Sequence, residues 1–133
     1  MLIHPLVVHF PIALWLTAAF FDVLGLRRPG EALFREMAYW LLGLGVAAAF
    51  VAIAVGWIDL WNLEAQGVGT GIEHRHLVHS SSAYVTTALF LAIFLWRWRR
   101  RNDVPAWAAV LSIIGALAVA LTGYLGHDMR QLM

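Results

Sequence analysis

Histidine is the residue of this sequence best suited to chemistry, and it is concentrated in three short segments. Residues 4–11, HPLVVHFP, hold two histidines and two prolines. Residues 73–79, EHRHLVH, hold three more, and one lies in GHDM at residues 126–129. Neutral imidazole is a common ligand of transition metals and of heme iron. Five of the six histidines are therefore candidates for a binding site, namely His4, His9, His76, His79 and His127, while His74 points away from the face of His76 and is expected to be solvated.

Carboxylates accompany these histidines and widen the possible chemistry. Glu73 precedes His76 at the E-x-x-H spacing of carboxylate-bridged metal sites, and Asp128 follows His127. The same Glu73 also completes a T-x-x-E capping box with Thr70, which is a structural alternative. The chain has no cysteine, so disulfides, thiolate metal sites and covalent c-type heme attachment are excluded.

The elements that must position these residues are membrane-spanning helices. The chain is 62% hydrophobic, and only 13% of its 133 residues are charged, against about 25% in an ordinary soluble domain. Four apolar runs carry this excess, each near the roughly 20 residues that span a bilayer core. We therefore predict an all-α fold, a four-helix transmembrane bundle that forms one domain over residues 1–133, with helices at about 5–26, 36–58, 71–98 and 105–126.

The arginines predict the orientation of this bundle. All nine basic residues are arginines, and seven of them lie between helices 1 and 2 or between helices 3 and 4. Under the positive-inside rule these two loops are cytoplasmic, so both termini face outward. Binding of anionic lipid is a minor alternative role for the same arginines. No nucleic-acid partner is predicted, and the partner of the chain is the lipid bilayer.

This orientation places every histidine near the outer face of the membrane. His4 and His9 open helix 1, the segment 74–79 opens helix 3, and His127 closes helix 4. Asp22 lies instead about three turns beyond His9, toward the cytoplasmic end of helix 1. Two roles are open for Asp22: pairing with an arginine of the inner loops, or handling a proton.

Small and polar side chains indicate which faces point into the bundle. His76 and His79 lie about 60° apart on helix 3, and Ser80, Thr86 and Thr87 continue the same stripe inward. Lipid offers these groups no partners, so we expect them to face the interior. Further small residues follow one face of helices 2 and 4, where they permit either close helix packing or room for a planar cofactor: Gly43, Gly45, Gly56, Ser112, Gly115, Thr122, Gly123 and Gly126.

Three segments resemble a known bacterial family. The opening HPLVVHFPIALWLTAAFFDVLG, GWIDLW at the end of helix 2 and TGYLG at the end of helix 4 are similar to the predicted membrane proteins called domain of unknown function 2231. The resemblance implies a multi-pass, four-helix module of the bacterial inner membrane, joined in some members to Rieske-type or cytochrome domains, with no activity generally assigned. His4 and His9 match its opening histidines, and Asp22 and Asp59 match its acidic positions.

The first functional hypothesis is a b-type heme bound noncovalently near the outer face. One histidine of helix 1 and one of helix 3 then serve as axial ligands, and the protein carries electrons. His9 and His79 are the expected pair, because each lies at least one turn inside its helix. His76 and His4 are the further candidates, and Arg75 and Arg130 are available to the heme propionates.

The second hypothesis is a transition-metal ion held by histidine and carboxylate. The candidate ligands are His4, His9, His76, His79, His127, Asp59 and Glu73. The third hypothesis is a structural or docking subunit without a cofactor, whose histidines are satisfied by water, headgroups and helix ends. In each case the small extramembrane surface favours an electron-transfer module, a homo-oligomer or a subunit of a larger redox complex over a stand-alone enzyme.

Overall fold

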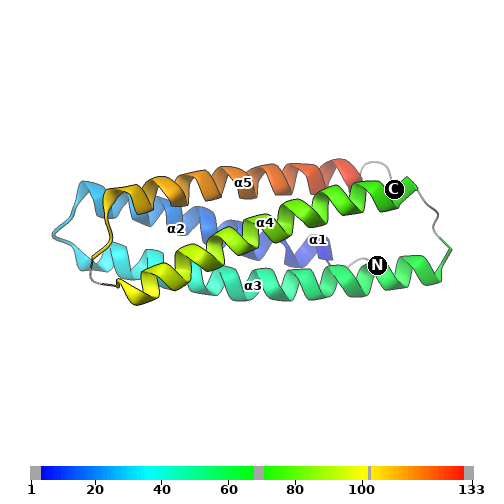
Figure 1. The fold of residues 1–133 in the computed structure, drawn as a ribbon, viewed down its shortest axis with the longest axis horizontal. Helices are drawn as coiled ribbons and strands as arrows, with labels where there is room; N and C mark the ends of the chain where they lie inside the picture. Colours follow the sequence, from blue (N-terminus) through cyan, green and yellow to red (C-terminus); the bar gives the residue numbers. More distant parts are fainter. Residues whose placement is uncertain (1–3, 68–70, 102, 131–133) are drawn as a thin grey trace.

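A computed structural model describes residues 4–67, 71–101 and 103–130, except for the side chains of residues 5, 71–76, 122 and 125–130. Its described residues form helices and no strands, which confirms the all-α prediction. The helices are α1 (His4–Val7), α2 (His9–Arg27), α3 (Ala32–Ala65), α4 (Gly71–Arg99) and α5 (Ala106–Arg130). Because α1 and α2 follow one another as the first leg, the architecture is the expected four-helix bundle (Figure 1).

The first leg is interrupted at Val8, where a single helix over 5–26 was expected. Proline has no backbone N–H, so Pro11 cannot bond the carbonyl of Val7 one turn earlier. Val8 itself keeps helical angles, with φ −63° and ψ −22°, and its N–H donates to the His4 carbonyl at 3.0 Å. The prolines therefore loosen the helix without turning the chain away from its direction.

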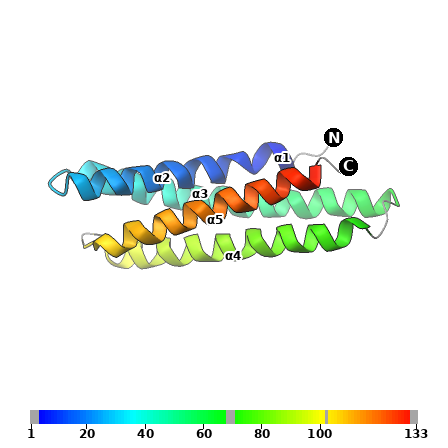
Figure 2. The ribbon, with the colours of Figure 1, turned by 90° about the horizontal axis from the view of Figure 1, so that it is seen from above.

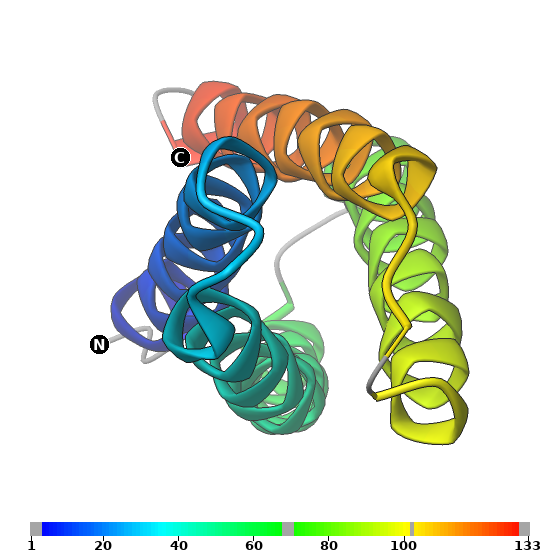
Figure 3. The ribbon, with the colours of Figure 1, turned by 90° about the vertical axis from the view of Figure 1, so that its left-hand side faces the viewer.

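The helices run alternately up and down, so the bundle has two chemically different ends. The α2–α3 and α4–α5 connections share one end with the loop arginines, which we call the arginine end (Figure 1). The start of α1, the end of α3, the start of α4 and the end of α5 share the other, which we call the histidine end (Figures 1 and 2). Viewed along its length, the bundle has the helices around a ring in the order α2, α3, α4, α5 (Figure 3).

Aromatic and aliphatic side chains fill the middle of the bundle. Trp15 of α2 stacks on Phe90 of α4, with ring centroids 4.1 Å apart and planes 5° from parallel. Around this stack lie the other members of the core cluster: Ala18, Leu42, Val46, Ala49, Ile93 and Val119. Thr86, Thr87 and Ser112 are buried as well, which confirms that the polar stripe of α4 and the small-residue face of α5 point inward.

The outer surface of the bundle is apolar. Within the described residues, α2, α3 and Leu77–Arg99 of α4 are long and apolar enough to cross a membrane, while α5 contributes the shorter apolar segment Ala106–Leu121. Large apolar side chains on this surface are exposed to the surroundings of the protein, including Leu6, Phe20, Val85 and Leu117. Exposed tryptophans mark both ends, with Trp57 and Trp61 at one and Trp40 and Trp98 at the other, as aromatic belts at a membrane interface require.

We predict that the arginine end faces the cytoplasm. Reporter domains fused after Gly30 or after Arg101 are expected to behave as cytoplasmic, because moving either loop outward would carry its arginines across the bilayer. Alkaline phosphatase and fluorescent-protein fusions measure this directly. Periplasmic activity at either position would reverse the orientation and move the histidine end to the cytoplasmic side.

Candidate functional site

His4 is fixed against α3 by contacts to its backbone and its ring. Its backbone N–H, which has no partner within α1, donates to Oδ2 of Asp59 at 2.8 Å. Its ring Nδ1 lies 2.9 Å from the carbonyl oxygen of Ala52. A Cβ placed on Gly56 would lie 3.0 Å from that same Nδ1, so the glycine provides the space that the ring needs. Three positions of one α3 face therefore hold His4 in place.

These contacts also decide the tautomer of His4. A carbonyl oxygen only accepts hydrogen bonds, so the Nδ1 of His4 carries the proton that it donates to Ala52. The Nε2 of the neutral ring is left with a lone pair. A backbone carbonyl that holds the other ring nitrogen is the usual arrangement behind a metal-ligating imidazole. The ring of His4 is thus held with Nδ1 toward the backbone of α3, and Nε2 is the nitrogen that remains for another contact.

The second imidazole of the site comes from α4. His79 is buried, and its ring centroid lies 5.9 Å from that of His4, with the planes at 82°. A histidine of helix 1 and one of helix 3 therefore meet at the histidine end, in the combination of helices that the sequence indicated. Asp59 is buried beside them.

The structure brings His4 to His79, whereas the sequence favoured His9 as the partner. His9 begins α2 on an exposed face of the bundle. The two histidines of the opening segment are five residues apart, about 140° around a helix, so they cannot both point at α4. The bond from Asp59 and the space above Gly56 select His4 for the interior.

The remaining predicted ligands fall where the structure gives the backbone alone. Glu73, Arg75 and His76 belong to the first turns of α4, and His127 and Arg130 to the last turns of α5. Their side chains, with that of Asp128, lie outside the described residues. Their helices begin and end at the histidine end (Figure 2).

A metal centre is not formed by the side chains that are described. Of the predicted metal ligands, His4, His9, Asp59 and His79 belong to this part of the chain. No group of three or more histidine, cysteine, aspartate or glutamate side chains within it is arranged to hold a metal ion. Asp59 is engaged by the backbone of His4 and so serves first as an acceptor at the start of α1.

The glycines of the helix interfaces make room for rings of this chain. A Cβ on Gly45 would collide with the indole of Trp15, and one on Gly115 would come 2.7 Å from the ring of Phe90. Gly43 faces Phe94 in the same way, at 2.8 Å. The space that the sequence left open for a planar cofactor at these three glycines is thus occupied by the protein itself, and close packing is their role.

The arginine end holds a second buried polar group. Arg97 of α4 donates to both carboxylate oxygens of Asp22 at 2.7 Å. Its Nη2 also donates to the hydroxyl of Ser112 at 3.1 Å. The side chains of Arg97 and Asp22 are only 2% and 5% exposed. Of the two roles left open for Asp22, the structure thus shows pairing with an arginine, Arg97 near the end of α4, and the pair with Ser112 ties α2, α4 and α5 together.

Sequence reasoning missed the groups that orient His4 and Arg97. The Ala52 carbonyl is a backbone group, so residue types carry no sign of it. Gly56 and Asp59 do carry one, because their spacing of three places a gap and a carboxylate on one helix face where another segment can approach. Ser112 was assigned to a packing face, although its hydroxyl also accepts from Arg97.

Comparison with known proteins gives a family and no activity. A family model described as Predicted membrane protein (DUF2231) matches residues 2–131. No curated protein and no solved structure matches the chain. The family match therefore covers all of the helices, and the function must be argued from the histidine end.

Proposed function

We propose that this chain, which belongs to the DUF2231 family of predicted membrane proteins, binds heme b between His4 and His79 and carries electrons near one face of the membrane. The observation that carries the proposal is the meeting of these two imidazoles from α1 and α4. The heme supplies one-electron transfer, and the protein supplies its axial ligands, its orientation and its surroundings.

The separation of the rings supports a shared iron. Two imidazoles that bind one iron from opposite sides at about 2 Å have ring centroids roughly 6 Å apart. The centroids of His4 and His79 are 5.9 Å apart. His4 and His79 would hold the heme iron, and to do so the two rings would have to give up the edge-to-face contact that they make in this structure.

The number of ligands also favours heme over a bare metal ion. A low-spin heme needs two axial side chains, while protein zinc sites have at least three protein ligands. The described side chains supply a pair of imidazoles, which is the number that such a heme needs. A transition-metal ion that recruits His76 or His127 is accordingly the second candidate, and the experiment below distinguishes it.

The surroundings support a module that works beside another protein. The described surface is dominated by apolar side chains, such as Phe10, Val51 and Leu121, with short polar connections. Such a surface suits lipid and neighbouring transmembrane helices. We propose a homo-oligomer or a subunit of a larger redox complex in the bacterial inner membrane, with the histidine end close to its electron partner.

Optical spectroscopy of the purified protein tests the heme proposal. We expect a Soret band and, after reduction, a sharp α band. His4→Ala and His79→Ala are expected to abolish or strongly alter these bands, because each removes one axial nitrogen. His9→Ala is the matched control, since it changes the same residue type on an exposed face and is expected to retain the spectrum.

The other outcomes separate the alternatives. A colourless protein with stoichiometric zinc, copper or iron by elemental analysis would replace heme by a metal ion. A colourless protein without metal would leave the third hypothesis, a structural or docking subunit without a cofactor. Loss of the spectrum in His9→Ala, with His4→Ala unchanged, would transfer the axial role to His9.

A further inference from the structure

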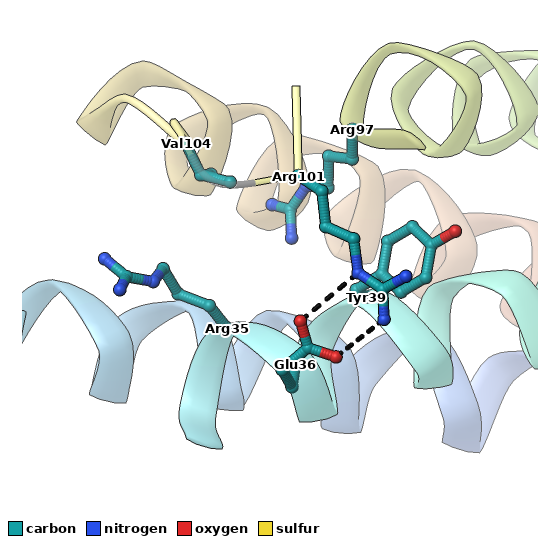
Figure 4. Close-up of a pocket in the computed structure, with 6 residues that line it drawn as sticks. All are labelled: Arg35, Glu36, Tyr39, Arg97, Arg101 and Val104. Carbon is teal, nitrogen blue, oxygen red and sulfur yellow. Dashed lines mark hydrogen bonds and ion pairs between the residues drawn. The ribbon is translucent and has the colours of Figure 1, made fainter. Parts of the chain in front are cut away.

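A shallow pocket lies at the arginine end, far from the histidine pair. It is a small depression open to solvent, where the first turns of α3 approach the end of α4 and the connection to α5. Figure 4 shows the six lining residues: Arg35, Glu36, Tyr39, Arg97, Arg101 and Val104. Three of the six are arginines and one is an acid, so the lining is cationic.

The acid of the pocket is already engaged by one of these arginines. Arg101 donates to both carboxylate oxygens of Glu36, at 3.2 and 2.8 Å, and its guanidinium lies 4.6 Å from the ring centroid of Tyr39 (Figure 4). The hydrogen bonds to Glu36 raise the pKa of Arg101 above its already high ordinary value. The ion pair thereby offsets the negative charge of Glu36 and holds Arg101 in one position beside the opening of the pocket.

Arg97 contributes a donor that no described atom accepts. Its two terminal nitrogens are taken by Asp22 and Ser112, but its Nε has no hydrogen-bond partner within the described part of the chain. The side chain is 2% exposed, and a buried charged donor without an acceptor is costly. Arg97 lines the pocket, so an acceptor oxygen that reached this Nε would satisfy it.

Arg35 supplies the charge that remains unbalanced. Within the described residues no carboxylate lies at ion-pair distance from it, and its side chain points away from the Glu36–Arg101 pair (Figure 4). The fitting ligand is thus an anion with several acceptor oxygens, and a phosphate group has both properties.

The level of the pocket relative to the membrane indicates the source of that phosphate. Trp40, Trp98 and Trp107 surround the arginine end with half or more of each side chain exposed. Such tryptophans lie at the level of the lipid headgroups. We infer that the pocket binds the phosphate of an anionic phospholipid headgroup, with Arg35 and Arg97 as its main donors.

Native mass spectrometry of the intact protein in detergent tests this inference. Phosphatidylglycerol, phosphatidylcholine and inorganic phosphate are titrated separately. We expect retained phosphatidylglycerol adducts, few phosphatidylcholine adducts, and no displacement by inorganic phosphate at equal concentration. Arg35→Gln is expected to weaken phosphatidylglycerol binding about fivefold, the contribution typical of one basic residue near a membrane surface.

Two further variants control for charge and for folding. Arg28→Gln removes the same charge from the same end, at an exposed residue outside the pocket, and is expected to change binding less than about twofold. Glu36→Gln removes the only acid of the lining, so we expect tighter phosphatidylglycerol binding. Thermal unfolding without added lipid shows whether each variant is folded.

Three results would overturn the inference. An equal loss in Arg28→Gln and Arg35→Gln would show diffuse attraction to the arginine end. Weaker binding in a folded Glu36→Gln would exclude the pocket as the site. Effective displacement by inorganic phosphate would identify free phosphate as the ligand in place of lipid.

Discussion

Replacing Asp22 by alanine is expected to lower the free energy of unfolding by about 3–5 kcal/mol, the cost typical of removing one partner from a buried ion pair. The change leaves the guanidinium of Arg97, which is 2% exposed, with the hydroxyl of Ser112 as its described acceptor. Thermal and denaturant unfolding in one detergent, followed by circular dichroism, measures the loss.

The controls separate this buried pair from charge in general. Glu36→Ala breaks an ion pair whose side chains are more than two-fifths exposed, so we expect a much smaller loss of stability than in Asp22→Ala. The double variant Asp22→Leu with Arg97→Met removes both charges and is expected to recover most of the stability. An Asp22→Ala protein that unfolds like the unmodified chain would refute a structural role for the pair.

Replacing Gly45 by valine is expected to destabilise the bundle by about 1–3 kcal/mol, the range for overpacked cores. Even the first carbon of a side chain at this position collides with the indole of Trp15. The indole cannot easily yield, because it is 3% exposed and stacks on Phe90. The midpoint of thermal unfolding is the measurement.

A matched glycine and a compensating change sharpen this test. Gly30→Ala adds a carbon where no atom lies within 4 Å, so we expect the stability to be unchanged. Trp15→Phe shortens the ring that Gly45 accommodates, so the double variant is expected to lose less than the sum of the single changes. Strict additivity would contradict contact between the two positions.

The segregation of charge and histidine in the sequence predicted the layout of the molecule. Arginines in alternate loops and histidines at the opposite helix ends are properties of position along the chain, and an up-and-down bundle preserves them. Pairing of Asp22 with an arginine was one of the two roles that the sequence left open, and the contact with Arg97 supports it. The choice of Arg97 among the loop arginines did not follow, because it depends on the rotation of α4 about its axis.

The other features that the sequence left open depend on the rotation of each helix about its axis and on contacts between residues far apart in the chain. Helical periodicity separates His4 from His9, but the selection between them rests on Ala52 and Asp59, 48 and 55 residues away. The small residues of α3 and α5 indicated either close packing or room for a planar cofactor. Which aromatic rings of the chain occupy the space beside them depends on tertiary contacts. The pocket beside Arg35 likewise requires α3 and the end of α4 to be placed first.

The separation of Asp22 and Arg97 along the chain also bears on how the protein is made. The two residues are 75 positions apart, a stretch that a ribosome needs roughly 4–15 s to translate. Until α4 has been made, the carboxyl group of Asp22 lacks the arginine that binds it in the folded bundle. The ion pair that ties α2 to α4 is therefore completed only after the second half of the chain has been made.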